Sequence, residues 1–307
     1  MKRILVPTDF SPLSEAAFAP AVVFAKKYGA EITVIHIIDA LEYNASYPYL
    51  DLSSHHQQIQ RLTQEHLAAA AEKLSAAGAE KVHTTYRVGT PFREVTSEVE
   101  HEEGTDLLVV ATHGFSGFRR FVVGSVAESI VRRSKCPVLS VHSSGTSREF
   151  AIRRVLVPTD LSPRGDAAVL QADKIAAQFG ATIELFFVDT PPVYGPGPSP
   201  MFGLPVTPAE VQSLRGSFEN HLNTLAKTLT TNEVTIRVEE APHPSEAIAA
   251  RAKDGGFDAI FMGSHGRRGL HAWVIGSVAE RVVRIAEIPV LVLKSQPNDN
   301  PETDGMN

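Results

Sequence analysis

Residues 4–12 are ILVPTDFSP, and residues 155–163 are VLVPTDLSP. Three further pairs keep almost the same spacing: YGAEITVIHIID (28–39) with FGATIELFFVD (179–189), DLLVVATHG (106–114) with DAIFMGSHG (258–266), and CPVLSV (136–141) with IPVLVL (288–293). The spacing hardly changes along the chain, so a whole half of the sequence is duplicated. Each copy spans about 145 residues, which is the size of a domain and not of a solenoid repeat.

The domain limits follow from this duplication. We expect one domain at 1–145 and a second at 150–295, joined by the polar segment HSSGTSREF (142–150). The polar and acidic end of the chain, 296–307, is expected to be a disordered tail.

Short apolar runs alternate with longer helical patterns in each copy. In the first copy the predicted strands are RILVPT (3–8), ITVIHII (32–38), VHTTYRV (82–88), DLLVVA (106–111) and PVLSVH (137–142), and helical patterns cover 14–29, 57–78 and 91–102. Continuous apolar runs are typical of strands buried on both faces of a parallel sheet. Strand–helix alternation then predicts an α/β fold with two tandem doubly wound domains, each on a five-stranded parallel sheet.

Two segments lack this regularity, 39–56 and the proline- and glycine-rich 189–208, and each follows the second strand of its copy. Loops at the carboxyl ends of parallel strands border the ligand crevice of such sheets. These segments are therefore either lids over a ligand or plain surface loops.

Composition narrows the class of protein. The 307 residues carry a net charge of −6, with 43% hydrophobic and 21% charged residues, as in soluble globular proteins. An acidic chain argues against a nucleic-acid partner, and no apolar run is long enough for a signal peptide or a membrane span. One cysteine, Cys136, excludes an intrachain disulfide, and its apolar setting favours a buried hydrophobe over a reactive thiol. We expect a cytoplasmic protein.

A glycine-containing loop follows the fourth strand of each copy and ends in the same five residues. The second copy has GSHGRRGLHAWVIGSVAE at 263–280, and the first has VGSVAE at 123–128. Ser277 is a good N-cap type, and the free N–H groups after Gly276 would bind an anion with the helix dipole behind them. Arg267 and Arg268 add positive charge to the loop. The alternative is that these glycines only permit tight turns.

The pattern Gly-x2-Gly-x9-Gly-Ser, together with VPTD at the end of the first strand, resembles the universal stress protein family. The resemblance covers nearly the whole chain as two tandem copies. It implies a Rossmann-like, adenine nucleotide alpha hydrolase-like domain in each copy. It also implies binding of ATP, or another adenine nucleotide, together with Mg²⁺, at the carboxyl ends of the strands.

The same resemblance assigns site residues by position. In the second copy they are Pro158, Thr159, Asp160, Val188, Met262, Gly263, His265, Gly266, Gly276, Ser277 and Val278, and in the first copy Pro7, Thr8, Asp9, Ile37, Val110, His113, Gly114, Gly124, Ser125 and Val126. Val188 and Met262 would flank the adenine, with the register of Val188 uncertain by one residue. Asp9 and Asp160 would lie near the ribose or a bound Mg²⁺. As residue types alone, these aspartates could equally be N-caps of the following helices.

Each copy departs from the family pattern once. Ala111 occupies the first glycine position of the loop in the first copy, and Ala241 stands where the first copy has Gly89. If the first glycine position needs a positive φ, Ala111 is strained there, and if the glycine only gives room, alanine fits. The second departure is expected to change the adenine-side wall of the other site.

Other candidate sites have simpler alternatives. The P-loop, the Gly-x-Ser-x-Gly elbow and the His-Glu-x-x-His helix do not occur in the sequence. His113 and His265 are candidate bases, but loop histidines more often bond backbone or ligand. Asp51, His55, His56 and His66 could bind a surface metal, although solvated histidines are far commoner. The basic residues around the first glycine loop are either a solvated face or phosphate contacts: Arg119, Arg120, Arg132, Arg133 and Lys135.

Three functions remain in view. The leading hypothesis is a nucleotide-dependent binding and regulatory module in stress response, more a binding protein than a dedicated enzyme. Its alternatives are a slow ATPase or phosphoryl-transfer enzyme and a nucleotide-free interaction protein. Family resemblance further implies pairing of the two domains through their fifth strands within one chain, with a homodimer of whole chains left open and the protein partner unknown.

Overall fold

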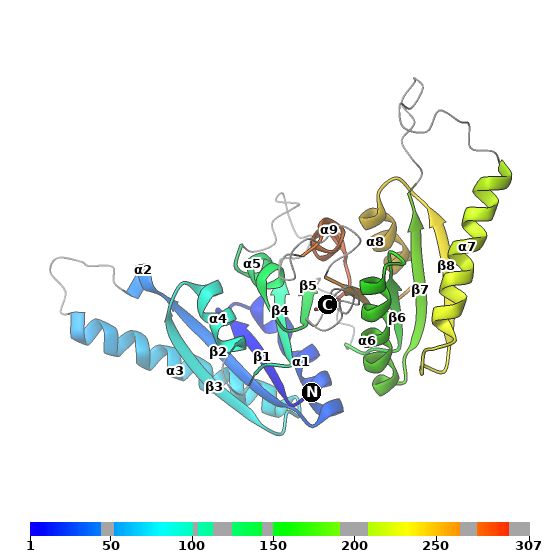
Figure 1. Ribbon diagram of the computed structural model, residues 1–307. Coiled ribbons are helices and arrows are strands. Elements are labelled where there is room, and N and C mark those ends of the chain that lie inside the picture. The colour runs from blue at the N-terminus through cyan, green and yellow to red at the C-terminus, as the bar shows by residue number, and fades with distance from the viewer. Residues whose placement is uncertain are drawn as a thin grey trace, which may run out of the picture. The chain divides into compact units, whose positions relative to one another are not determined.

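The computed structural model describes residues 1–43, 52–100, 104–112, 125–142, 150–190, 208–264 and 275–294 (Figure 1). These residues fall into two compact units. The first unit contains the described residues up to Ala151, together with Ile275 and Glu287–Lys294. The second contains those from Ile152 to Ser264 and Gly276–Ala286.

Strands and helices alternate along both copies. The first copy has β1 (Arg3–Thr8), the 3₁₀ helix η1 (Ser14–Ala17), α1 (Phe18–Tyr28), β2 (Glu31–Asp39), α2 (Ala40–Tyr43), α3 (Leu52–Ala76), β3 (Val82–Gly89), α4 (Pro91–Val99), β4 (Leu107–Thr112), α5 (Ser125–Arg133) and β5 (Val138–His142). The second has β6 (Arg154–Pro158), α6 (Pro163–Phe179), β7 (Thr182–Asp189), α7 (Pro208–Ala226), β8 (Val234–Glu240), α8 (Pro244–Asp254), β9 (Ala259–Gly263), α9 (Ser277–Ile285) and β10 (Val290–Leu293). This sequence of elements confirms the predicted α/β class.

The first unit is built on parallel strands in the order β3-β2-β1-β4-β5. Pairing of Ile4 with both Ile32 and Leu107 fixes the register on the two sides of β1. The central strands are buried on both faces, and β4 has four fully or nearly buried residues in succession from Leu107. This continuous apolar pattern is the one that predicted a parallel sheet.

The last strand of the chain also belongs to the first unit. β10 pairs antiparallel with β5, with Val290 opposite Ser140 and Val292 opposite Val138. This ladder covers the backbone edge of β5, which would otherwise be open to pairing with another chain.

The second unit repeats the parallel arrangement as β8-β7-β6-β9. In both units the strand order reverses beside the first strand of the copy, between β1 and β4 and between β6 and β9. Ligands of doubly wound sheets bind at such a reversal, outside the carboxyl ends of the strands.

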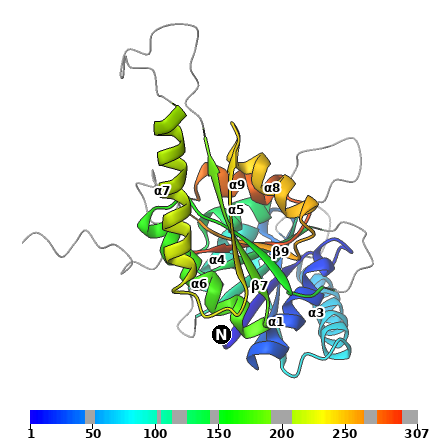
Figure 2. The same ribbon diagram turned by 90° about the vertical axis from the view of Figure 1, so that its right-hand side faces the viewer.

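Helices cover both faces of each parallel sheet (Figures 1 and 2). In the first unit α1 and α3 pack on one face and α4 and α5 on the other. In the second unit α6 and α7 share one face, where His221 Nε2 of α7 lies 3.0 Å from Asp166 Oδ2 of α6. Helices α8 and α9 cover the opposite face of that sheet.

The structure shifts some predicted boundaries. The helix expected over 14–29 is split into η1 and α1, and Pro20 lies in the first turn of α1, where its missing N–H is tolerated. The helix expected over 57–78 begins earlier, at Leu52, and ends at Ala76. The short helix α2 lies inside 39–56, which was expected to be irregular. Most of 189–208 and all of 296–307 lie outside the described residues.

Candidate functional site at the carboxyl ends of the strands

The turn after β1 is fixed by two side chains, Thr8 and Asp9. Buried Thr8 Oγ1 accepts the N–H of Phe10 at 3.0 Å and lies 2.9 Å from Ser14 Oγ. Asp9 Oδ1 accepts the N–H of Ser11 at 3.0 Å and its hydroxyl at 2.5 Å. The Asp9 carboxylate is thereby held at the exposed end of the strand, beside the strand-order reversal.

The second copy builds the same turn after β6. Thr159 Oγ1 accepts the N–H of Leu161 at 3.1 Å, and Asp160 Oδ1 accepts the N–H and hydroxyl of Ser162 at 3.2 and 2.6 Å. Thr159 is as buried as Thr8. The duplicated sequence thus gives a duplicated local geometry.

A left-handed residue follows the aspartate in both turns. Phe10 has φ of 64° and Leu161 has φ of 59°, and they are the two non-glycine residues with positive φ in the described chain. A side chain in this conformation costs roughly 1–2 kcal/mol. Such strain persists where surrounding contacts over-determine it, typically at ligand sites. Its recurrence at matched positions points to a functional turn in each copy.

The structure corrects the N-cap interpretation of Asp9 and Asp160. Ser162, not Asp160, caps α6, and its Oγ accepts the N–H of Gly165 at 3.0 Å. In the first copy Leu13 is the N-cap residue of η1 and makes no side-chain cap bond. Both carboxylates instead hydrogen-bond within the turn itself, just after the carboxyl ends of β1 and β6.

The carboxylate of Asp9 is kept ionised by its hydrogen bonds. Burial acts to raise the pKa of Asp9, but bonds from Ser11 and Ser14 and from backbone N–H groups outweigh it and bring the pKa below its ordinary value. Asp9 therefore carries a full negative charge at neutral pH, which suits a bound cation or a ribose hydroxyl.

Strand register places the second-strand residues consistently. Pro7 lies opposite Ile35, and Pro158 lies opposite Phe186, so Ile37 and Val188 occupy equivalent positions two residues further on. Val188 is therefore the second-copy counterpart of Ile37. Val188 is buried, whereas Ile37 is half-buried.

Sequence reasoning missed two residues beside the first turn. The ring of His36 stacks on Phe10 with centroids 4.2 Å apart, and its Nδ1 lies 2.8 Å from the carbonyl oxygen of Thr8. The second copy has Phe187 at the position of His36 and Leu161 at that of Phe10. Comparing the two copies position by position could have identified this difference, because a histidine replaces a phenylalanine within an otherwise apolar strand.

The fourth strands deliver the other wall of each crevice. Val110 of β4 and Met262 of β9 are buried, and Ala111 and Gly263 follow them toward the carboxyl end. In the second unit the N–H of Gly276 donates to the carbonyl oxygen of Ser264 at 2.6 Å. That bond brings the start of α9 directly next to the end of β9.

The amino terminus of α9 has no side-chain cap bond. Gly276, not Ser277, is the N-cap residue, with extended backbone and no side-chain cap bond, which corrects the expectation for Ser277. Ser277 is exposed in the first turn of the helix. Val126 of α5 and Val278 of α9, at matched positions, are each 38% exposed. The N–H groups of an uncapped helix start can bind an anion, and the exposed apolar groups beside them can contact an organic group that carries the anion.

Several predicted residues lie outside the described chain: His113, Gly114, Gly124, His265 and Gly266. Ser125 begins α5, but its side chain is outside the described part as well. Within the second unit, the Thr159–Asp160 turn follows β6, which pairs with β9, and the start of α9 lies beside the end of β9.

Comparisons with known proteins agree with this arrangement. The sequence profile of the universal stress protein family matches residues 1–142 and 151–294. This chain belongs to the universal stress protein family. It is a tandem member, with one family domain in each copy.

Individual relatives agree with the family assignment in sequence and in structure. A universal stress protein of Staphylococcus aureus (strain USA300) is 34% identical over 149 residues, 48% of this chain and 89% of the relative. The crystal structure of a universal stress protein from Archaeoglobus fulgidus is 25% identical, covers 95% of this chain and 98% of its own, and has a TM-score of 0.69. A Pseudomonas aeruginosa protein of unknown function shares the fold, with a TM-score of 0.66 at 19% identity over 96% of this chain and 92% of its own.

The two universal stress protein domains differ beside their second crevice wall. In the first, Thr90 precedes Pro91 at the start of α4, and a Cβ on Gly89 would lie 2.4 Å from Glu94 Oε1. In the second, the N–H of Ala241 donates to the carbonyl oxygen of Asp189 at 2.9 Å. Gly89 is thus the last residue of β3, opposite Asp39, whereas Ala241 directly follows β8 and extends its hydrogen bonding to β7.

The histidines of α3 make aromatic contacts. His56 stacks on Tyr43 with centroids 4.0 Å apart, and His66 lies 5.0 Å from the ring of Phe10. Asp51 lies outside the described residues. Among the residues that the structure describes, no group of three or more His, Cys, Asp or Glu is placed to hold a metal ion.

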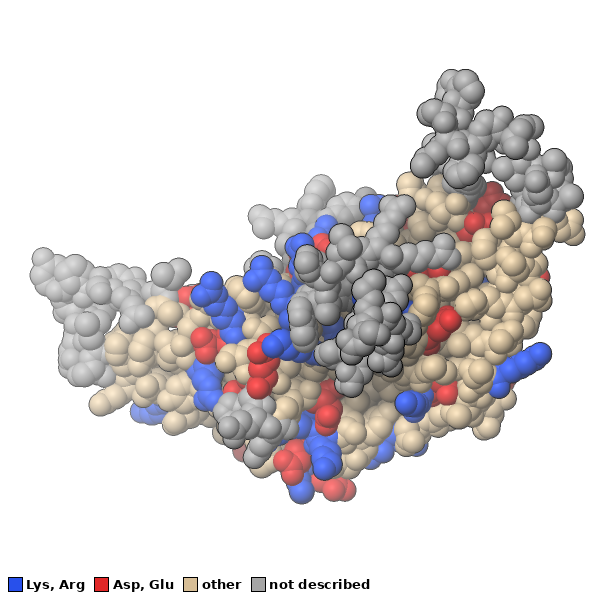
Figure 3. Space-filling view, in the orientation of Figure 1, with Lys and Arg blue, Asp and Glu red and all other residues tan. Residues whose placement is uncertain are grey.

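Two surface properties complete the description. No helix within the described ranges combines the length and the apolar character needed to cross a membrane. Lys and Arg side chains are interspersed with Asp and Glu on the described part of the face in Figure 3.

Proposed function

We propose that this tandem universal stress protein is a cytoplasmic regulatory module that binds ATP in one or both domains and signals through its occupancy. The observation that carries the proposal is the strained Thr–Asp turn, which recurs with the same hydrogen bonds at the strand-order reversal of both units. Such a reversal is the general ligand position of this fold.

Each part of the crevice suits one part of an adenine nucleotide. Buried apolar residues such as Met262 and Val188 offer a surface for the base, and Asp160 offers an acceptor for ribose hydroxyls. The amino terminus of α9 offers backbone N–H groups to the phosphates, with Gly276 allowing close approach. The remaining family positions of both domains take the corresponding roles by the same resemblance.

Magnesium fits this donor set. Mg²⁺ prefers carboxylate and phosphate oxygens and keeps several of its waters. Asp9 is exposed and its pKa is lowered, so an ionised oxygen is on hand at the crevice mouth. Asp9 in the first domain and Asp160 in the second would each hold an ion in their own site, and that ion would neutralise phosphate charge.

Occupancy would be read at the surface. Nucleotide binding would change the surface of the domain, and a protein partner would recognise the bound state. The antiparallel ladder of β10 on β5 supports a second proposal, that the fifth strands pair the two domains within one chain. A homodimer of whole chains would add a further interface.

A conservative pair of variants tests the nucleotide and metal roles together. Asp9→Asn and Asp160→Asn keep an oxygen for the Ser11 and Ser162 bonds but remove both charges. For wild type, ATP with Mg²⁺ at a hundredfold excess over Kd should add about 2.7 kcal/mol of stability, seen as a rise in Tm. Chelating the Mg²⁺ should weaken wild-type binding and leave the double variant unchanged.

The two alternative functions predict other results. No rise in Tm with any adenine nucleotide would favour the nucleotide-free interaction protein. Hydrolysis of ATP that disappears in His265→Ala would favour the slow ATPase. Binding equally dependent on Mg²⁺ in wild type and double variant would contradict the roles given to Asp9 and Asp160.

A further inference from the structure

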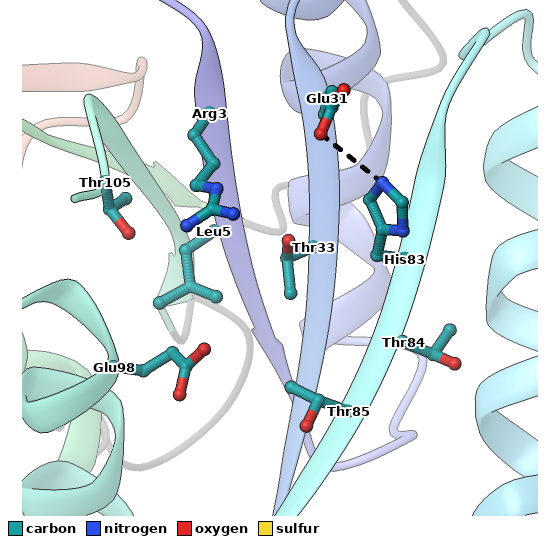
Figure 4. Close-up of a pocket in the computed structure, with 9 residues that line it drawn as sticks. All are labelled: Arg3, Leu5, Glu31, Thr33, His83, Thr84, Thr85, Glu98 and Thr105. Atoms are coloured by element: carbon teal, nitrogen blue, oxygen red, sulfur yellow. Dashed lines mark ion pairs between the residues drawn. The ribbon is translucent and has the colours of Figure 1, made fainter. Parts of the chain in front are cut away.

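A polar groove lies on the first domain, away from the proposed nucleotide site (Figure 4). It has a volume of about 400 Å³ and is lined chiefly by residues from β1, β2 and β3 and by Glu98 of α4. Arg3 and Glu31 begin their strands, so the groove lies toward the amino ends of the sheet. The Thr8–Asp9 turn is at the opposite, carboxyl end.

The strand register explains why most of the lining side chains share one face of the sheet. Arg3 lies opposite Glu31, Leu5 opposite Thr33, and Thr33 opposite His83. Figure 4 shows Arg3, Thr33 and Glu98 directed into the same space, and Thr105 at its edge.

The second domain has a tightly filled cluster at the same place in its fold. Arg251 donates from Nε and Nη2 to the two oxygens of buried Glu184 at 2.7 and 2.6 Å. Arg154 Nη2 lies 3.7 Å from Glu184 Oε2. The guanidinium carbons of Arg154 and Arg251 lie 4.3 and 5.4 Å from the centroid of the Phe257 ring.

The correspondence follows from backbone landmarks. Gly104 and Gly256 both have φ of 66°, and Thr105 and Phe257 follow them directly. Asp106 Oδ2 accepts the N–H of Arg3 at 3.1 Å, as Asp258 Oδ2 accepts that of Arg154 at 3.0 Å. Thr105 therefore stands exactly where the second domain has its aromatic ring.

The other two positions follow in the same way. Thr33 lies opposite Leu5 as Glu184 lies opposite Leu156. Glu98 has the position in α4, counted from its first proline, that Arg251 has in α8. The first domain thus keeps the arginine of β1, Arg3. It has Thr105 in place of the Phe257 ring and Thr33 in place of the Glu184 carboxylate. It has the carboxylate of Glu98 where the second domain has the guanidinium of Arg251.

The groups missing from the first domain define a ligand. We propose that the groove binds a small molecule consisting of an aromatic ring that bears a cationic nitrogen group, such as an aryl amidine. The ring would occupy the place of the Phe257 side chain, against the guanidinium of Arg3 in a cation–π contact. The cationic group would reach Glu98 and restore, with reversed polarity, the ion pair that Arg251 and Glu184 make.

The two carboxylates of the groove, Glu98 and Glu31, are in ion pairs with exposed side chains, and Glu31 Oε2 also lies 3.4 Å from His83 Nε2. Glu98 pairs with Arg87 at 3.0 Å and Glu31 with Lys81 at 3.0 Å, but Arg87 and Lys81 are 45% and 66% exposed. Exposed ion pairs contribute roughly 0–1 kcal/mol, so a ligand can exchange for them at little cost. This site does not depend on nucleotide binding by the same domain.

Benzamidine is a direct probe, followed by amide NMR shifts of the full chain. We expect saturable shifts at Thr33, Thr85 and Thr105, with affinity at least tenfold weaker for benzoate and for benzyl alcohol. Thr105→Phe, which introduces the ring that the second domain uses, should weaken binding at least tenfold. Glu98→Gln should weaken it at least threefold and remove the preference over benzyl alcohol.

The control is Thr224→Phe, at an exposed position of α7, which should bind benzamidine like wild type. Equal binding of benzamidine and benzoate, shifts confined to residues outside the groove, or unchanged affinity in folded Thr105→Phe would each overturn the proposal. If Thr105→Phe does not fold, Glu98→Gln decides alone, because retained charge preference in that variant is incompatible with the site.

Discussion

At the scale of single residues, the two turns show how a duplicated sequence is adapted. Ser14 of the first copy adds a hydroxyl contact to Thr8, and the second copy has Gly165 in its place. A Cβ on Gly165 would lie 2.4 Å from Asp160 Oδ1 and 2.9 Å from Thr159 Oγ1. The glycine therefore lets α6 begin against the turn, while the first copy starts with the 3₁₀ helix η1.

Gly165→Ala should disturb this contact. Because the added methyl meets both turn side chains, we expect a loss of about 1–3 kcal/mol in the free energy of unfolding, measured by urea denaturation. Gly216→Ala is the matched control, since its Cβ would meet nothing within 4 Å. A neutral Gly165→Ala with unchanged nucleotide affinity would show that the turn tolerates displacement.

Asp173 provides a pH-dependent contribution to stability. It is 3% exposed and accepts four bonds from Thr230 and Thr231, at 2.6 to 2.9 Å. Burial acts to raise the pKa of Asp173, but these bonds outweigh it and lower the pKa below 3.8. The stabilisation is therefore full above the unfolded pKa and is lost as pH falls through the lower folded value.

Asp173→Asn should reduce stability at pH 7 by about 1–3 kcal/mol, because an amide cannot accept all four bonds. It should also flatten the fall in stability between pH 5 and pH 2, read from urea midpoints at each pH. An equally steep fall in the variant would assign acid sensitivity to other carboxylates.

The sequence predicted where the turns lie but not how their side chains bond or what His36 contacts. The repeated Thr-Asp pair identified the turns. The sequence alone could not distinguish an aspartate that caps the helix from the arrangement observed, in which Asp160 accepts a bond from Ser162 and Ser162 caps the helix at Gly165. The role of His36 was not predicted, because it depends on the strand register that places His36 beside Thr8.

At the scale of elements, the Arg251–Glu184 pair fixes α8 on β7. Glu184 is 5% exposed, so its charge is supported by Arg251 and, at longer range, Arg154. Arg251→Met should cost about 3–5 kcal/mol, because it leaves a buried carboxylate short of its partner. Adding Glu184→Leu should recover much of that loss. A double-mutant cycle by urea denaturation measures the coupling, and additive losses would contradict it.

Element positions were largely predictable, for a physical reason. Strands buried on both faces leave continuous apolar runs, and all five first-copy strands were found within a residue or so of the expected limits. Helix starts were less predictable because Pro20 and Gly165 act through local geometry and not through the apolar period. The short α2 has too few residues to show a period at all.

At the scale of the whole molecule, duplication has produced two domains that each contain the Thr–Asp turn but differ at the amino ends of their strands. The first keeps an open groove at its amino-terminal strand ends, and the second fills that place with Phe257 and its arginines. The last strand, β10, completes the sheet of the first unit, and Lys294 Nζ just after it donates to the carbonyl oxygen of Val131 at 2.8 Å. The fold followed from the repeat and the family resemblance from its motifs, whereas the place of β10 in the first unit needed the structure.

One or both domains are proposed to bind ATP, and calorimetric titration of ATP with Mg²⁺ counts the sites directly. We predict two sites for wild type and one each for Gly276→Val and Gly124→Val, because a branched side chain at the helix start blocks close approach of phosphate. A single wild-type site lost only in Gly276→Val would restrict binding to the second domain. Absence of binding to the wild type, or two sites in both variants, would contradict the account.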